Sequence, residues 1–175
     1  MKKLTTIVAA IALFLSASAF TPGPDENVLS TFFKVSNART VSAGRVNNSV
    51  TYAFNQKYTN AQNVSWTQAD NFYFASFDLK ENSFAVAYSD EGEFIAVSRK
   101  LELNQISMAA EEAIKEQFKE YVIPSTVTEI VLMGETNYYF TVEGKSAYLQ
   151  LKCSPNGTIN VEKRIKKKTL VGKVY

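Results

Sequence analysis

The feature that most constrains this chain is an internal similarity between two stretches that lie 65 residues apart. Three segments of the first stretch match three segments of the second in aromatic alternation, apolar alternation and turn chemistry. Because all three pairs share one offset, the pattern predicts one structural unit used twice. The matching pairs are Tyr73–Phe77 with Tyr138–Val142, Phe84–Tyr88 with Leu149–Cys153, and Asp90–Phe94 with Pro155–Ile159.

A helix is expected at the start of each unit. In the second unit Ser107 is a plausible N-cap, apolar residues then recur at helical spacing, and Pro124 ends the pattern. The first helix is expected to be shorter, around Val50 and Phe54, with Asn48 or Ser49 as its cap.

Four strands are expected after each helix, separated by turn residues such as Asp70-Asn71 and Gly144-Lys145. The predicted class is α+β: two tandem helix-plus-four-strand antiparallel units, with the helices packed on one face of the sheet. The expected strands are Asn63–Ala69, Phe72–Lys80, Ser83–Ser89, Glu93–Leu101, Thr126–Met133, Asn137–Glu143, Ser146–Cys153 and Thr158–Ile165.

The N-terminus has the pattern of a secretory signal peptide. Lys2 and Lys3 precede a short apolar run, and Ala17-Ser-Ala19 is typical of a cleavage site. We therefore expect a periplasmic or secreted protein that is cleaved after Ala19 and keeps no membrane span. The expected organisation is a signal peptide (1–19), a leader or linker (20–47), the first unit (48–104), the second unit (105–168) and a basic tail (169–175).

Hairpin geometry predicts which residues face the core. A two-residue turn at Glu81-Asn82 pairs Phe77 with Val86 and places alternate residues such as these on one face of the sheet. A three-residue turn through Gly92 adds Phe94 and Ala96 to the same face. In the second unit a two-residue turn at Gly144-Lys145 pairs Val142 with Ala147 on the same face, and the turn through Gly157 corresponds to that through Gly92.

The opposite face of the predicted sheet is unusually apolar for a surface in contact with water. Two explanations stay open: the face binds a protein partner, or the apolar segment Val28–Val35 folds over it. The candidate binding residues on this face are Phe74, Ile95, Val97, Tyr139 and Tyr148.

These residues carry a resemblance to a known group of proteins. The segment Phe54–Trp66, followed by Tyr73-x-Ala-x-Phe77 and Val86-x-Tyr88-x-Asp90-x-Gly92, resembles the PepSY-like, β-lactamase-inhibitor-protein-like repeats of secreted Gram-negative proteins. The resemblance implies an antiparallel sheet packed on helices, secretion, and non-catalytic binding or inhibition. It supplies no inhibitory contact residue for this chain.

The composition removes several chemistries. The chain has no His and a single Cys, so Ser–His and Cys–His nucleophilic pairs and His-ligated metals are excluded. Cys153 alternates with Leu149 and Leu151, which predicts a buried apolar role. We expect no catalytic residue, no metal and no cofactor.

Charge gives little indication of the partner. Loss of Lys2 and Lys3 with the signal peptide leaves 17 basic and 17 acidic residues, which gives no general case for nucleic-acid binding. Basic residues concentrate near the C-terminus, where they either protect an edge strand from aggregation or bind an anionic surface.

Three functions remain open. The leading hypothesis is a binding or inhibitory module for a periplasmic or extracellular protein. The alternatives are an NTF2-like cone that binds or transforms a small molecule, and an envelope structural protein that associates with itself.

Overall fold

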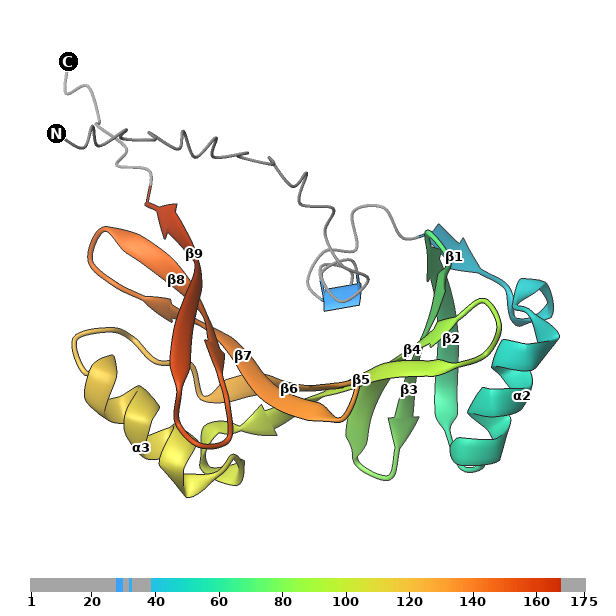
Figure 1. Cartoon of the computed structure of the whole chain (residues 1–175), viewed down its shortest axis with the longest axis horizontal. Coiled ribbons are helices and arrows are strands. Elements are labelled where there is room, and N and C mark those ends of the chain that lie inside the picture. Colours follow the sequence, from blue (N-terminus) through green and yellow to red (C-terminus); the bar gives the residue numbers. More distant parts are fainter. Residues whose placement is uncertain (1–27, 30–31, 33–38, 168–175) are drawn as a thin grey trace, which may run out of the picture.

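A single antiparallel sheet of nine strands forms the body of the protein, with the strands paired in sequence order (Figure 1). The computed structural model describes residues 28–29, 32 and 39–167; the predicted signal peptide and basic tail lie outside this range. The strands are β1 (Arg39–Val41), β2 (Gln62–Ala69), β3 (Phe72–Leu79), β4 (Asn82–Ser89), β5 (Phe94–Glu102), β6 (Thr126–Leu132), β7 (Glu135–Glu143), β8 (Ala147–Cys153) and β9 (Ile159–Lys166).

The prediction of two tandem helix-plus-four-strand units is wrong. β5 and β6 pair along seven residues, from Ala96 opposite Leu132 to Glu102 opposite Thr126, so one sheet continues through the expected boundary. A separate first unit would leave this edge of β5 without hydrogen-bond partners, and pairing with β6 satisfies it. The sheet also gains β1, from a stretch that was expected to be part of the leader.

Two short helices lie on the convex side of the curved sheet, and the segment around Val28 lies on its concave side (Figure 1). The helices are α2 (Asn48–Lys57) and α3 (Met108–Gln117), each preceded by a 3-10 turn, η2 (Ala43–Arg45) and η3 (Leu103–Gln105). Ser107 is the N-cap of α3, and its hydroxyl accepts a hydrogen bond from the Ala110 N–H, as expected.

The convex face carries two clusters of buried side chains, one beneath each helix. Under α2, Phe54 packs edge-on against Trp66 and Phe77, with ring centroids 5.2 and 5.1 Å apart. Under α3, Ile114 and Cys153 belong to the second cluster, and both are fully buried. The predicted buried role of Cys153 is therefore confirmed, and Trp66 is also part of the core.

The predicted buried face of β3 and β4 is correct although the register is shifted. The turn lies at Lys80-Glu81, so Phe77 pairs with Phe84 and Ala75 with Val86. This differs from the expected pairing by two residues. Since side chains alternate with a period of two, a two-residue shift leaves every side chain on the same face.

A β-bulge places Ala96 and Val97 on faces opposite to those predicted. Tyr88 pairs with Phe94, but the next residue, Ala87, pairs with Ala96, so Ile95 is the extra residue. Val97 then lies opposite Val86 and packs with the cluster under α2. The prediction that Val97 lies on the outer face is therefore wrong.

Candidate functional site on the concave face

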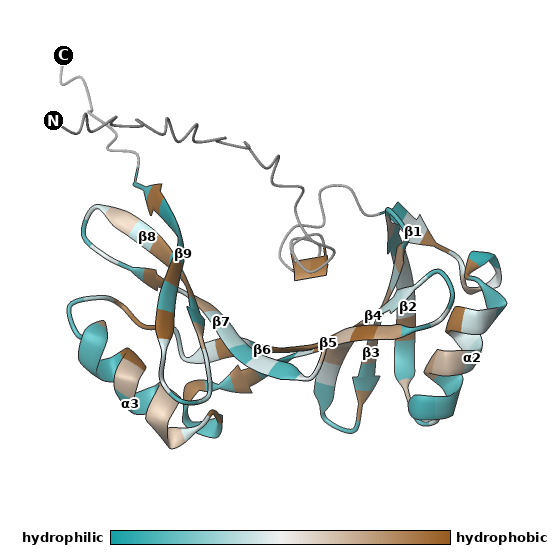
Figure 2. Ribbon diagram, viewed as in Figure 1, coloured by the Kyte–Doolittle hydropathy of each residue, from teal (hydrophilic) through white to brown (hydrophobic). Residues whose placement is uncertain are grey.

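The concave face of the first strands is covered by the chain itself. Val28 is fully buried and belongs to a cluster with Phe74, Ala87 and Ala96. The ring of Phe32 meets that of Phe74 edge-on at 5.5 Å. Figure 2 shows the hydrophobic segment at Val28 inside the curve of the sheet. Of the two explanations for this apolar face, coverage applies here, through Val28 and Phe32 of the predicted segment.

The concave face of the last three strands is more open. Residues paired across β7, β8 and β9 form rows on it: Tyr139 lies opposite Lys152, and Thr141 opposite Gln150, which lies opposite Lys163. Tyr148, 37% exposed, lies opposite Ile165, 39% exposed. We call this surface the concave platform, and its residues are Tyr139, Thr141, Tyr148, Gln150, Lys152, Lys163 and Ile165.

The two platform tyrosines have different surroundings. Lys167 places its ammonium 5.0 Å from the centre of the Tyr148 ring and forms an ion pair with Glu143. These contacts hold Tyr148 at one end of the platform. Burial raises the pKa of Tyr139 to about 12, and the carboxylates of Glu162 and Glu135 add to the effect. Tyr139 therefore stays a neutral phenol at physiological pH.

Cations line this platform. Lys152 and Lys163 form no salt bridge with any residue between 39 and 167. Glu143 is paired with Lys167, which leaves the carboxylates of Glu135 and Glu162 as the nearby negative charge on β7 and β9. The surface combines exposed apolar side chains with positive charge that is available to a ligand.

The five predicted binding residues do not form one surface. Phe74 and Ile95 belong to the covered cluster, and Val97 lies on the convex face. Tyr139 and Tyr148 are on the concave platform. Sequence reasoning missed Ile165, which belongs with Tyr148; its only signal is an apolar residue within a basic strand.

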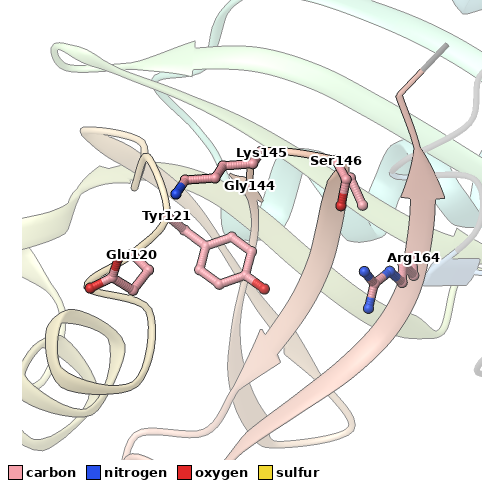
Figure 3. A pocket seen from close by; sticks show the side chains of 7 residues that line it. Glu120, Tyr121, Gly144, Lys145, Ser146 and Arg164 are labelled. Atoms are coloured by element: carbon pink, nitrogen blue, oxygen red, sulfur yellow. The ribbon is translucent and has the colours of Figure 1, made fainter. Parts of the chain in front are cut away.

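A small pocket lies on the convex side of the sheet, next to β8 and β9. It encloses about 240 Å³ and is lined by Glu120, Tyr121, Gly144, Lys145, Ser146, Ala147 and Arg164. In Figure 3 the Tyr121 hydroxyl and the Arg164 guanidinium point toward one another, while Glu120 and Lys145 lie on the other side.

The backbone fixes the wall of this pocket. Val122 and Glu143 exchange backbone hydrogen bonds of 2.8 and 3.0 Å, which ties the segment after α3 to the end of β7. The Tyr121 ring then lies so close to Gly144 that a Cβ there would be 2.7 Å from its Cε1 atom. A side chain at position 144 would therefore force the Tyr121 ring to shift.

The described residues contain neither a cluster suited to a metal ion nor a helix that could cross a membrane. No group of three or more Cys, Asp or Glu residues there is arranged to hold a metal ion. No helix in the described part of the chain is long and apolar enough to cross a membrane.

Comparison with solved structures shows which fold this is. The chain is similar to a BLIP-like protein from Bacteroides fragilis, with 20% identity, a TM-score of 0.60, and coverage of 71% of this chain and 89% of that one. A DUF2874 family protein from Bacteroides ovatus has 20% identity and a TM-score of 0.59 over 68% of this chain and 86% of its own. A Bacteroides eggerthii protein, described as periplasmic, has 20% identity and a TM-score of 0.60 over 70% and 90%.

No family model matches the chain, and the comparison with curated proteins finds no match. The likeness to a BLIP-like structure supports that half of the resemblance noted from the sequence, and nothing found supports the PepSY-like half. At this level of identity the comparisons show the fold alone: the chain has the antiparallel-sheet fold of BLIP-like and DUF2874 proteins.

Proposed function

We propose that this protein is a non-enzymatic binding module of the periplasm or cell exterior. Its concave platform takes a protein partner that presents carboxylates around an apolar contact. The signal-peptide pattern at the N-terminus supports this location, as does the fold shared with a BLIP-like protein and with a protein described as periplasmic.

One observation carries the proposal: among the described residues, Val28 and Phe32 cover the concave face at one end of the sheet, and none covers it at the other. Val28 and Phe32 pack on the cluster around Phe74, whereas Tyr148 and Ile165 remain more than a third exposed. Tyrosine is enriched among the side chains that anchor protein interfaces. Lys152 and Lys163 would attract and orient an acidic partner.

Site-specific crosslinking tests the proposal. A photo-crosslinking amino acid replaces Tyr148 in the exported protein, and a matched protein carries it at Tyr52, which is 68% exposed on α2. We expect one defined adduct from position 148 and none from position 52. The captured protein is then purified, and its affinity for wild-type protein is measured.

Variants of the purified pair complete the test. Replacing Tyr148 by Ser and Lys163 by Glu together is expected to weaken binding at least tenfold, because an anchor is lost and a favourable charge is reversed. Tyr52→Ser is the control and is expected to bind like wild type. Equal capture from both positions, or unchanged affinity of the double variant, would show that the platform is not the binding surface.

A further inference from the structure

The last strand presents an open edge in the described structure. β9 pairs with β8, and no strand among residues 39–167 pairs with its other side. The Lys167 N–H donates to the Ser146 carbonyl at 2.9 Å, so residues 146 and 167 form a hydrogen-bonded pair. Because such pairs alternate along an antiparallel ladder, the backbone groups of Arg164 and Lys166 point away from β8.

The side chains of this edge are basic on the convex face. Arg164 lies opposite the buried Leu149, and Lys166 lies opposite the buried Ala147, so both side chains are on the helix side of the sheet. Neither forms a salt bridge with a residue that the structure describes. Glu162 is the one carboxylate on β9.

Arg164 of β9 also lines the pocket of Figure 3. Arg164 contributes its guanidinium to the pocket, where it approaches the Tyr121 hydroxyl near Ser146. A guanidinium and two hydroxyls are donors suited to a carboxylate. Glu120 is also in the lining, but it lies on the far side from Arg164 (Figure 3).

We propose that the outer edge of β9 binds an extended acidic peptide segment by strand addition. The segment exchanges backbone hydrogen bonds with Arg164 and Lys166, and one of its carboxylates enters the pocket against Arg164. Main-chain hydrogen bonds supply affinity in this mode of recognition, and the side-chain pocket supplies specificity. This site uses the outer edge and the convex side of β9, whereas the concave platform uses the concave side of β7, β8 and β9.

Charge decides between an acidic segment and a second copy of the same strand. Two copies of β9 paired edge to edge would bring Arg164 and Lys166 of each copy close to the same residues of the other, and like charges in opposed positions are destabilising. A peptide from another protein with carboxylates at alternate positions would instead attract Arg164 and Lys166.

The test uses a synthetic ten-residue peptide with glutamate at every second position and threonine at the positions between. Its affinity for the mature full-length protein is measured by calorimetry, and backbone amide exchange is followed by NMR. We expect binding that slows exchange of the Arg164 and Lys166 amides, because these N–H groups become hydrogen-bonded.

Two control peptides and two protein variants separate strand addition from general electrostatic attraction. A peptide with glutamine for glutamate is expected to bind at least tenfold more weakly, because the charge-assisted hydrogen bonds are lost. A peptide that keeps its charges but is N-methylated at alternate residues is expected not to bind. Arg164→Gln is expected to weaken binding about tenfold, whereas Arg45→Gln, the same change on exposed η2, leaves it unchanged.

The outcomes that overturn the proposal are equally specific. The proposal is wrong if the peptide does not bind at millimolar concentration, or if the N-methylated peptide binds equally well. It is also wrong if the amides protected from exchange lie away from β9. Sedimentation that shows the wild-type protein dimerising through this edge would assign it to a second copy instead.

Discussion

The cover over the concave face makes a quantitative prediction about Val28. This side chain is fully buried against the cluster that contains Phe74. Val28→Ala removes two methyl groups, each worth about 0.8 kcal/mol of burial, and leaves a small cavity that adds to the loss. We expect the free energy of unfolding to fall by about 1.5–2.5 kcal/mol. For a domain of this size the midpoint temperature would fall by roughly 4–8 °C.

Urea denaturation of the mature chain, followed by tryptophan fluorescence and circular dichroism, measures this loss. Val122→Ala is the matched control: its side chain is 68% exposed, so we expect a change within about 0.5 kcal/mol. If Val28→Ala unfolds like wild type while Phe74→Ala is strongly destabilised, the cluster is stable without its cover. The assignment of the N-terminal segment to the concave face would then be wrong.

Three further predictions concern the convex core and its turns. Tyr88→Phe should raise the stability by about 1 kcal/mol in urea unfolding, because the buried Tyr88 hydroxyl has no hydrogen-bond partner among the described residues; Tyr73→Phe, which loses a hydrogen bond to Asn47, should not. Gly157→Ala should cost about 2 kcal/mol or more, since its φ is +87° and a Cβ would lie 2.8 Å from the Ala109 carbonyl oxygen. Gly134→Ala should cost less, because Gly134 has a similar φ of +86° but an added Cβ would meet no atom within 4 Å. A smaller loss of stability at Gly157 than at Gly134 would contradict the predicted clash with Ala109. Burial raises the pKa of Cys153 to about 11, so native protein should resist alkylation at pH 8.5, and stability should fall from about pH 8.5 toward 11 as the unfolded thiol ionises. Rapid labelling of native protein at pH 8.5 would refute the burial.

The buried face of the sheet was predictable because side-chain alternation tolerates even shifts. The β7–β8 hairpin was expected to pair Val142 with Ala147, and the structure pairs Val142 with Leu149, yet both residues stay on the predicted face. Local pattern therefore identified what is buried without identifying the exact partner.

A one-residue bulge was not predictable in the same way. The run Phe94-Ile-Ala-Val97 is apolar throughout, so no polar residue marks where alternation changes phase. Ile95 is the residue that the bulge adds, and it reverses the faces of Ala96 and Val97. Two of the five candidate site residues depended on this stretch.

The pairing of β5 with β6, which joins the two predicted units into one sheet, also could not be predicted from local sequence patterns. Whether β5 pairs with β6 depends on contacts across residues 103–125, which include α3. The short β1 was missed because Arg39–Val41 is strand only through its pairing with Trp66 and its neighbours. Long-range pairing overrides weak local propensity in both cases.

The order of the strands has a consequence for how the protein folds. Every strand pairs with its neighbour in sequence, and most hairpins close over a few residues, as at Met133-Gly134 between β6 and β7. Pairing β5 with β6 must instead close the 23-residue connection 103–125, which costs about 2 kcal/mol more loop entropy than a two-residue turn. The short hairpins should therefore form first, and the β5–β6 seam should be the late step that makes the sheet continuous.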